Sequence, residues 1–161
     1  MLARATLFAF GLLAAALSCG ACGKPIDLKQ VLQVTDVSSG WFDVGIVAGK
    51  NKLVPSVTFR LKKQADVDVP VLSLNMVFKP EGDAEGDDVF VQRVEFVNGT
   101  ETGPITVRSQ YGYTADPPQT RLEMLKNSQF RDSTVQIFAR QSSSQWTELH
   151  RVTIARQLLT K

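Results

Sequence analysis

The stretch Val57-Thr58-Phe59-Arg60-Leu61-Lys62 decides the fold class, because its apolar and polar side chains alternate without a break. Successive side chains of an extended strand point to opposite faces of a sheet, so one face of this segment is buried and the other meets water. Leu72, Leu74, Met76 and Phe78 show the same spacing. Two half-buried strands of this kind predict an antiparallel sheet.

Further segments in which apolar and polar side chains alternate lie before and after these strands in the chain. Phe90, Val94 and Phe96 are expected on one face of a strand, and Trp146 begins the last strand. The apolar side chains of that last strand change parity, which predicts a β-bulge near His150. The remaining predicted strands are 31–37, 105–107, which follows an Asn98-Gly99 turn, and 135–140, which is apolar on both faces.

These segments make about seven strands separated by turn signals, which is typical of an antiparallel β-sandwich. One short helix is predicted over 119–127. Asp116 is expected to cap it, Pro117 suits the first helical position and Gln119 would complete a capping box. Leu122 and Leu125 would then face the sheet. The sequence therefore predicts one all-β domain with a single short helix.

The N-terminus has the composition of a secretion signal. Arg4 is followed by an uncharged run, 5–18, that is rich in Leu, Ala and Phe. As a helix these 14 residues would span about 21 Å, too little for a bilayer core of about 30 Å. A charged start, a short apolar run and small residues at its end indicate a cleaved signal peptide over residues 1–18.

Ala15-Ala16-Leu17-Ser18-Cys19 resembles the lipobox of bacterial lipoproteins, which implies that Cys19 is lipidated and begins the mature chain. Lipid chains on one cysteine would attach the protein to the bilayer permanently. Gly20, in place of Asp, implies sorting to the outer membrane, with the body in the periplasm. Two alternatives stay open, namely lipidation at Cys22 after a shifted cleavage, and ordinary cleavage after Ala21 to leave a soluble periplasmic protein.

Length and charge bound the rest of the chain. Residues 19–29 are expected to form the lipidated cysteine and a tether, and 30–161 a single sandwich domain.

Loss of the signal removes only Arg4, which leaves 17 of the 18 basic side chains against 16 acidic ones. That balance offers no field to attract nucleic acid. One histidine and two cysteines cannot supply the four ligands of a structural zinc site, and no cofactor is predicted.

An acidic stretch lies between two of the predicted strands. Asp83, Glu85, Asp87 and Asp88 are candidate metal ligands, because alternating carboxylates can surround a hard cation such as Ca²⁺. An EF-hand loop starting at Asp83 would need Gly at Asp88 and Glu at Val94, so that motif is absent. The composition favours a solvated hairpin tip.

Exposed aromatic side chains are the other candidate binding feature. Trp41 and Phe42 lie in a segment with little strand alternation, and Tyr111 and Tyr113 follow a strand end. Such side chains combine a large apolar area with polar atoms and are enriched at binding sites. The alternative is that they close the open ends of the sandwich. His150 is the only histidine, and without a Gly-x-Ser-x-Gly motif it is expected to be a packing residue.

Several stretches resemble a group of small, largely uncharacterised bacterial lipoproteins that carry one immunoglobulin-like β-sandwich. The matching stretches are 40–43, 49–56, 58–62, 108–109, 112–114 and 127–130. The resemblance implies the fold and an envelope location, but no catalytic residue.

The sequence therefore predicts a membrane-anchored envelope lipoprotein that is not an enzyme and that acts as a protein-interaction or assembly module. An envelope protein is its expected partner, bound through end loops or an open strand edge. The alternative is a lipoprotein that binds a small molecule, a glycan or a metal.

Overall fold

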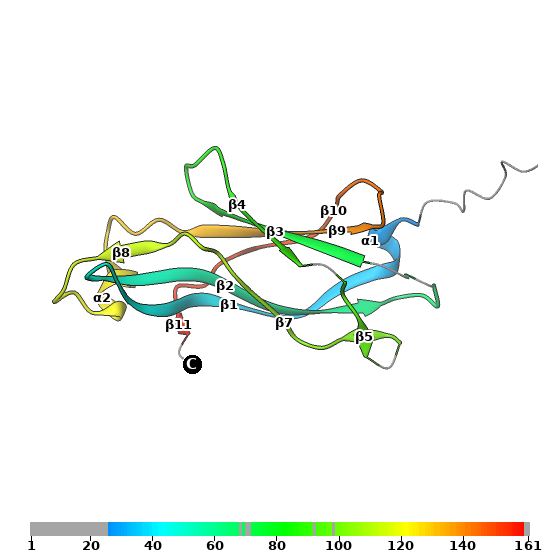
Figure 1. Cartoon of the computed structure of the whole chain (residues 1–161), viewed down its shortest axis with the longest axis horizontal. Helices are drawn as coiled ribbons and strands as arrows, with labels where there is room; N and C mark the ends of the chain where they lie inside the picture. The colour runs from blue at the N-terminus through cyan, green and yellow to red at the C-terminus, as the bar shows by residue number, and fades with distance from the viewer. Residues whose placement is uncertain (1–25, 68, 70–71, 92, 98, 160–161) are drawn as a thin grey trace, which may run out of the picture.

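The computed structural model describes residues 26–67, 69, 72–91, 93–97 and 99–159. The predicted signal segment, Cys19, its alternative Cys22 and Asn98 of the predicted turn lie outside these residues. Within them the chain forms two β-sheets that enclose one apolar core, with two short helices (Figure 1).

The larger sheet has the order β11-β1-β2-β6-β5, with β7 and β8 also paired to β2. The smaller sheet has the order β10-β9-β3-β4. All pairs are antiparallel except β1 with β11. The larger sheet contains β1 (Leu32–Val47), β2 (Lys50–Lys63), β5 (Phe96–Val97), β6 (Glu101–Thr102), β7 (Ile105–Arg108), β8 (Tyr113–Ala115) and β11 (Leu158–Leu159). The smaller one contains β3 (Leu72–Pro80), β4 (Asp87–Val91), β9 (Ser133–Gln141) and β10 (Thr147–Thr153).

The predicted all-β, largely antiparallel architecture is confirmed, with more strands than expected. The described residues contain eleven strands rather than about seven. Part of the difference arises beside β2, where β8, β7 and β6 pair in succession with residues of β2 that one continuous strand could have covered. The rest arises from the division of two predicted strands, into β4 and β5 and into β10 and β11.

The alternation of β2 and β3 places the core where the sequence predicted. Val57, Phe59 and Leu61 are fully buried and face Leu74 and Met76 of the other sheet within one apolar cluster. From β9, the side chains of Val135, Ile137 and Ala139 join them with no exposed surface. Because both sheets contribute to one cluster, the described residues form a single folded unit.

The segment Gly40-Trp41-Phe42-Asp43 lies within a strand, contrary to expectation. It belongs to β1, which pairs with β2 along most of its 16 residues. Two irregularities in the register, at 35–38 and 43–45, disturb the side-chain alternation and hide the strand from sequence analysis. Ala48 and Gly49 form the tight turn between the two strands, both with positive φ.

The strand predicted around Phe90 is wrong in extent, and Phe90 itself faces the opposite way, although Val94 and Phe96 do pack against the core. The predicted strand breaks into β4 and β5, which belong to different sheets. Arg93 lies between them with a φ of 59°. In β4 it is Val89 and Val91 that pack against the core, whereas Phe90 is exposed on the outer face. Phe90 contacts Trp146 there, with ring centroids 6.0 Å apart.

The bulge predicted near His150 is confirmed. The register between β10 and β9 shifts between Glu148 and His150. The predicted last strand is divided, because β10 ends at Thr153 and β11 follows after a bend. Leu158 and Leu159 then pair with Trp41 and Phe42 of β1, a pairing that has no local signal in the sequence.

The predicted helix exists but begins later than expected. It is α2 (Arg121–Lys126), and Thr120 is its N-cap instead of Asp116. Thr120 Oγ1 accepts from Glu123 N, and a Glu123 carboxylate oxygen accepts from Thr120 N at 2.6 Å. Hydrogen bonding from Thr120, chiefly from its backbone N–H, lowers the pKa of the Glu123 carboxyl. Leu125 is buried as predicted, but Leu122 is exposed.

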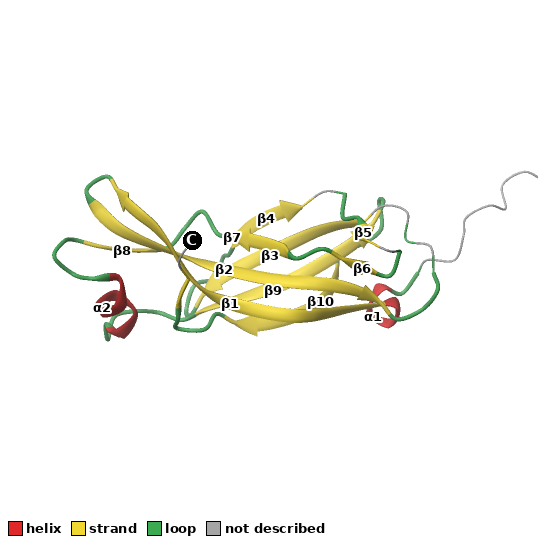
Figure 2. Cartoon of the chain, turned by 90° about the horizontal axis from the view of Figure 1, so that it is seen from below, coloured by secondary structure: helices red, strands yellow, loops and turns green. Residues whose placement is uncertain are grey.

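A second helix, α1 (Leu28–Val31), lies where the sequence predicted the end of the tether and the start of the domain. Its Leu28 is buried in the core and Asp27 caps it. α1 lies at the end of the molecule opposite to the β1–β2 turn and α2 (Figure 2).

We expect Thr120→Ala to lower the free energy of unfolding by about 1 kcal/mol, because it removes the hydroxyl that caps α2. Asp116→Ala is the matched control and should change it by less than about 0.5 kcal/mol, because Asp116 is an exposed partner of Lys50. Urea unfolding of both variants measures this. A larger loss of stability for Asp116→Ala would show that Asp116 is the N-cap of the helix, as the sequence predicted.

Candidate functional site

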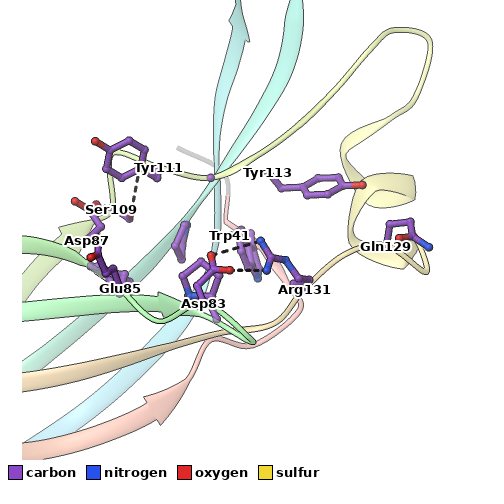
Figure 3. A pocket seen from close by; sticks show the side chains of 15 residues that line it. Trp41, Asp83, Glu85, Asp87, Ser109, Tyr111, Tyr113, Gln129 and Arg131 are labelled. Atoms are coloured by element: carbon purple, nitrogen blue, oxygen red, sulfur yellow. Dashed lines mark hydrogen bonds and ion pairs between the residues drawn. The ribbon is translucent and has the colours of Figure 1, made fainter.

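A cavity of about 430 Å³ opens between the two sheets. It is bounded by the β3–β4 loop, the link between β7 and β8, and the link between α2 and β9 (Figure 3). The residues that line it are Trp41, Pro55, Phe78, Pro80, Asp83, Glu85, Gly86, Asp87, Ser109, Tyr111, Gly112, Tyr113, Gln129, Arg131 and Ser133. Its volume lies in the range of roughly 300–1,000 Å³ that is typical of small-ligand sites.

Two aromatic rings of the cavity lining, those of Trp41 and Tyr113, pack against one buried phenylalanine. Trp41 of β1 packs edge-on against Phe130, with ring centroids 4.5 Å apart. Tyr113 of β8 contacts the same phenylalanine at 5.1 Å. Phe130 and Trp41 are buried, so neighbours on several sides hold both rings. Edge-to-face pairs of this kind add stability beyond the apolar area that they bury.

A hydrogen-bond network holds Tyr111 at the rim of the cavity. Asp87 Oδ2 accepts from Ser109 Oγ at 2.5 Å and from Gln110 N at 2.8 Å. Ser109 Oγ in turn accepts from Tyr111 N at 3.0 Å. The backbone beside Tyr111 is thereby tied to β4, while its ring is 72% exposed.

An ion pair crosses the opposite side of the cavity. Arg131 Nη1 donates to Asp83 Oδ1 at 2.6 Å and to the Glu81 carbonyl at 3.3 Å. Both charged side chains are partly exposed, so solvent weakens the pair. The pair therefore adds little to stability, but it links the β3–β4 loop to the segment before β9. Figure 3 shows Tyr111 and Ser109 on one side, Gln129 and Arg131 on the other, and Trp41 between them.

Two buried polar atoms in the lining have no hydrogen-bond partner among the described residues. They are Trp41 Nε1 and Ser133 Oγ. Trp41 is 4% exposed and Ser133 only 1%. A buried polar group without a partner costs about 1–3 kcal/mol, and most such groups in folded proteins have one. Both atoms have almost no accessible surface, so they lie behind the surface of the cavity, and Thr35 Oγ1, Asn75 Oδ1 and Arg140 Nε outside the lining lack a partner in the same way.

Three of the four predicted aromatic candidates meet at this cavity. Trp41, Tyr111 and Tyr113 line it, although their positions in the chain are far apart. Phe42 does not, because it follows Trp41 on a strand and points to the other face of the sheet. The Arg108 guanidinium lies over the Phe42 ring, 3.4 Å from its centroid.

The predicted metal ligands are not gathered into one cluster. Asp87 is bonded to Ser109, Asp83 to Arg131, and Asp88 Oδ1 to Asn75 Nδ2 at 2.8 Å. No group of three or more metal-ligating side chains occurs in the described part of the chain. The stretch nevertheless forms a hairpin loop, between β3 and β4, as predicted. Asp83, Glu85 and Asp87 reach the cavity as three separate carboxylates.

His150 lies away from this cavity, in a shallow hollow with Lys29, Glu148 and Arg151. Arg151 donates to both carboxylate oxygens of Glu148, at 3.1 and 3.3 Å, and Gln136 Nε2 donates to one of them. Chiefly through Arg151, these bonds lower the pKa of Glu148. Glu148 and Arg151 are thus paired with each other, so the hollow offers less for a ligand than the aromatic cavity.

Sequence analysis missed several residues that complete the cavity, chiefly Ser109, Gln129, Arg131 and Ser133. They come from the ends of β7 and β9 and the adjoining links, where no motif marks them.

No helix within the described ranges is long and apolar enough to cross a membrane. Comparison of the chain with protein-family models, with curated proteins and with solved structures found no match.

Proposed function

We propose that this protein is a non-catalytic binding lipoprotein of the cell envelope, and that the aromatic cavity is its ligand site. The observation that carries the proposal is a cavity of about 430 Å³, large enough for a small ligand, whose lining includes Trp41, Tyr111 and Tyr113. Aromatic side chains combine a large apolar area with polar atoms and are enriched at binding sites. The geometry thus favours the ligand-binding alternative over the protein-interaction module that the sequence favoured.

An immunoglobulin-like fold is part of the same proposal. If β6, β7 and β8 are counted as one interrupted strand, the larger sheet has the order β1, β2 and then this interrupted strand, and the smaller sheet has the order β10-β9-β3-β4. The first three would correspond to strands A, B and E of an immunoglobulin-like sandwich. The smaller sheet would correspond to strands G, F and C with an added C′ strand. The cavity then lies between the two sheets, next to the loop that joins β3 to β4.

Anchorage at Cys19 would orient this site usefully. α1 is the first described helix after the predicted tether, and it lies at the opposite end of the molecule from α2 (Figure 2). A chain attached to the outer membrane through Cys19 would therefore hold α2, the β1–β2 turn and the nearby cavity away from the lipid surface. A ligand in the periplasm would have free access.

The anchor is tested by replacing each cysteine in the native host. We expect Cys19→Ala to abolish palmitate labelling and to release the protein from sedimented membranes, because it removes the acylated thiol. Cys22→Ala is the matched control and should leave both properties unchanged. Labelling that is lost only in Cys22→Ala would move the anchor to Cys22, and labelling that persists in both variants would contradict lipidation at either residue.

The binding site is tested by Tyr111→Ala. Without ligand, this variant should melt close to the wild-type temperature, because the Tyr111 ring is 72% exposed. The low-molecular-mass fraction of the host's envelope should raise the melting temperature of the wild-type protein by several degrees, since saturating ligand adds about 2.7 kcal/mol at 100 times its Kd. The rise should be at least halved in Tyr111→Ala.

Ser143→Ala is the control for that measurement, because Ser143 is exposed in the β9–β10 turn, outside the cavity. It should keep the full ligand-dependent rise. An equal rise in Tyr111→Ala and Ser143→Ala, or no rise in the wild type, would show that the cavity is not the ligand site.

A second candidate function, the protein-interaction module, is supported by an exposed apolar tip. Val44, Ile46 and Val47 near the β1–β2 turn are all exposed, as is Leu122 of α2. Arg121 Nε donates to both Asp43 carboxylate oxygens, at 3.1 and 3.2 Å, and so holds α2 against this hairpin. Clustered exposed apolar side chains commonly mark protein contacts.

A further inference from the structure

We propose that the cavity binds a small organic amine in its protonated form, which deepens the ligand-binding function proposed above and rests on it. The ammonium group of this ligand lies between the ring of Tyr111 and the carboxylates of Glu85 and Asp87. Its apolar part lies along the aromatic lining. Figure 3 shows these three side chains on one side of the cavity and Arg131 on the other.

The charge of the lining attracts cations. Asp83, Glu85 and Asp87 contribute three carboxylates, and Arg131 is the one basic side chain among the described residues of the lining. Arg131 is paired with Asp83, away from Tyr111. Two carboxylates are thus left without a cationic partner in the described part of the chain, so the field of the cavity favours a cationic ligand and disfavours an anionic one.

Both of these carboxylates have oxygens that can accept a further hydrogen bond. Glu85 is exposed, and its side chain has no partner within the described ranges. Asp87 Oδ2 accepts from Ser109 Oγ and Gln110 N, whereas Oδ1 has no partner among the described residues and is not a buried atom. An ammonium N–H therefore finds acceptors at the cavity surface without breaking the bonds that hold the loop.

The Tyr111 ring supplies an aromatic face for the cation. It is 72% exposed, and no aromatic or cationic side chain of the described residues packs on it. The bond from Tyr111 N to Ser109 Oγ holds its backbone, which lowers the entropy lost on binding. A cation within about 6 Å of such a ring is attracted by the negative charge of its face.

An organic amine suits this arrangement better than a metal ion does. Ca²⁺ takes about six to eight oxygen ligands, and no group of three metal-ligating side chains occurs in the described residues. Tyr113 and Pro80 add apolar surface to the lining, which a bare metal ion would leave uncovered. The cavity volume of about 430 Å³ has room for an ammonium group together with an apolar body.

The experiment follows the tyrosine ring signals of the full-length protein by NMR after ¹³C labelling of the rings. Tyr111 and Tyr113 are the two tyrosines of the chain, and both line the cavity. Tyr111→Phe assigns their signals. The indole N–H signal of Trp146, assigned by Trp146→Phe, is the reference, because Trp146 does not line the cavity.

The probes are benzylamine, benzyl alcohol and benzoate at neutral pH, each up to about 50 mM. These three molecules have nearly the same size and differ in charge, so a difference in affinity among them measures the contribution of the cation. Calcium chloride is the fourth probe and tests the metal ion directly.

We expect benzylamine to shift the tyrosine signals, leave the Trp146 signal in place and bind at least about 5-fold more tightly than benzyl alcohol or benzoate. Glu85→Gln should weaken benzylamine about 3-fold, the effect of losing one exposed ion pair, because it removes the charge and keeps the shape. Glu95→Gln is the matched control and should have no effect, since Glu95 is exposed outside the cavity.

The contribution of the ring is measured with two variants of Tyr111. Tyr111→Ala, followed through the Tyr113 signals, should weaken benzylamine about 3-fold or more, because it removes the aromatic face. Tyr111→Phe keeps that face and should bind benzylamine as the wild type does. Equal affinities of Tyr111→Ala and Tyr111→Phe would contradict the placement of the cation on this ring.

Three further results would overturn the proposal. They are the absence of any tyrosine shift with benzylamine, binding of benzyl alcohol, benzoate or Ca²⁺ as tightly as benzylamine, and equal affinities of Glu85→Gln and Glu95→Gln. If the envelope fraction still stabilises the wild type more than Tyr111→Ala, the amine assignment alone fails and the ligand site stands. If that difference is also absent, the proposed function fails with it.

Discussion

Gly112→Ala is expected to lower the free energy of unfolding by about 3 kcal/mol or more. A Cβ at this position would lie 1.9 Å from the Leu53 carbonyl oxygen and 2.8 Å from its carbon, so the link between β7 and β8 presses directly on β2. The atoms in the way belong to backbone and cannot rotate aside. Overpacking typically costs 1–3 kcal/mol, and more where the neighbour is rigid.

Gly103→Ala is the matched control for this substitution. Gly103 lies in the same series of short segments, between β6 and β7, and a Cβ there would meet no atom within 4 Å. Its substitution should change stability by less than about 0.5 kcal/mol, or raise it slightly by restricting the unfolded chain. Urea unfolding at equilibrium measures both variants. Equal stabilities would mean that the close approach at Gly112 does not exist.

Gly112→Ala should also impair ligand binding. Gly112 lies between Tyr111 and Tyr113, and all three residues line the cavity. Movement of this link away from β2 would displace both rings and break the bond from Tyr111 N to Ser109 Oγ. We therefore expect the ligand-dependent rise in melting temperature to be lost in Gly112→Ala even at temperatures where the variant is folded.

Met124→Ala is expected to cost about 2–5 kcal/mol of unfolding free energy, the range for truncating a fully buried large apolar side chain. Met124 has no exposed surface and joins the same core cluster as Trp41 and Phe130. The substitution would leave a void beneath α2. Because α2 leads directly into Phe130 and Arg131, the cavity wall should loosen together with it.

Leu122→Ala is the control on the same helix. Leu122 is 57% exposed, so its truncation should change stability by less than about 0.5 kcal/mol. Thermal and urea unfolding of the pair distinguish the two helix faces. A larger loss of stability for Leu122→Ala than for Met124→Ala would show that Leu122 packs against the sheet, as the sequence predicted.

The helix shows why local patterns were insufficient at that point. Leu122 and Leu125 are three residues apart, so they share one face of a helix and the pattern predicts that both are buried. The structure buries Leu125 but leaves Leu122 exposed. Two capping signals also compete at the start of this helix. Asp116 is followed by Pro117, whereas Thr120 is followed three residues later by Glu123. The structure uses the second signal, and Met124 takes the buried position.

The candidate site was recoverable from the sequence only in part. Trp41, Tyr111 and Tyr113 were predicted because exposed aromatic residues often bind ligands, and they do line one cavity. Phe42 belonged to the same motif as Trp41, but strand geometry sends the two rings to opposite faces. Ser109 and Ser133 carry no sequence signal, because only the tertiary structure brings the ends of β7 and β9 to one cavity.

By itself, the sequence determined the strands of the core, the bulge near His150 and the acidic hairpin loop. Side-chain alternation, a change of parity and a run of charges are local signals, since each records which face of a strand meets water. Tertiary structure alone decided the division of the strand near Phe90, the parallel pairing of β11 with β1 and the assembly of the cavity. Each of these depends on contacts between residues far apart in the chain, for example Trp41 with Phe130, whose pairing no local pattern encodes.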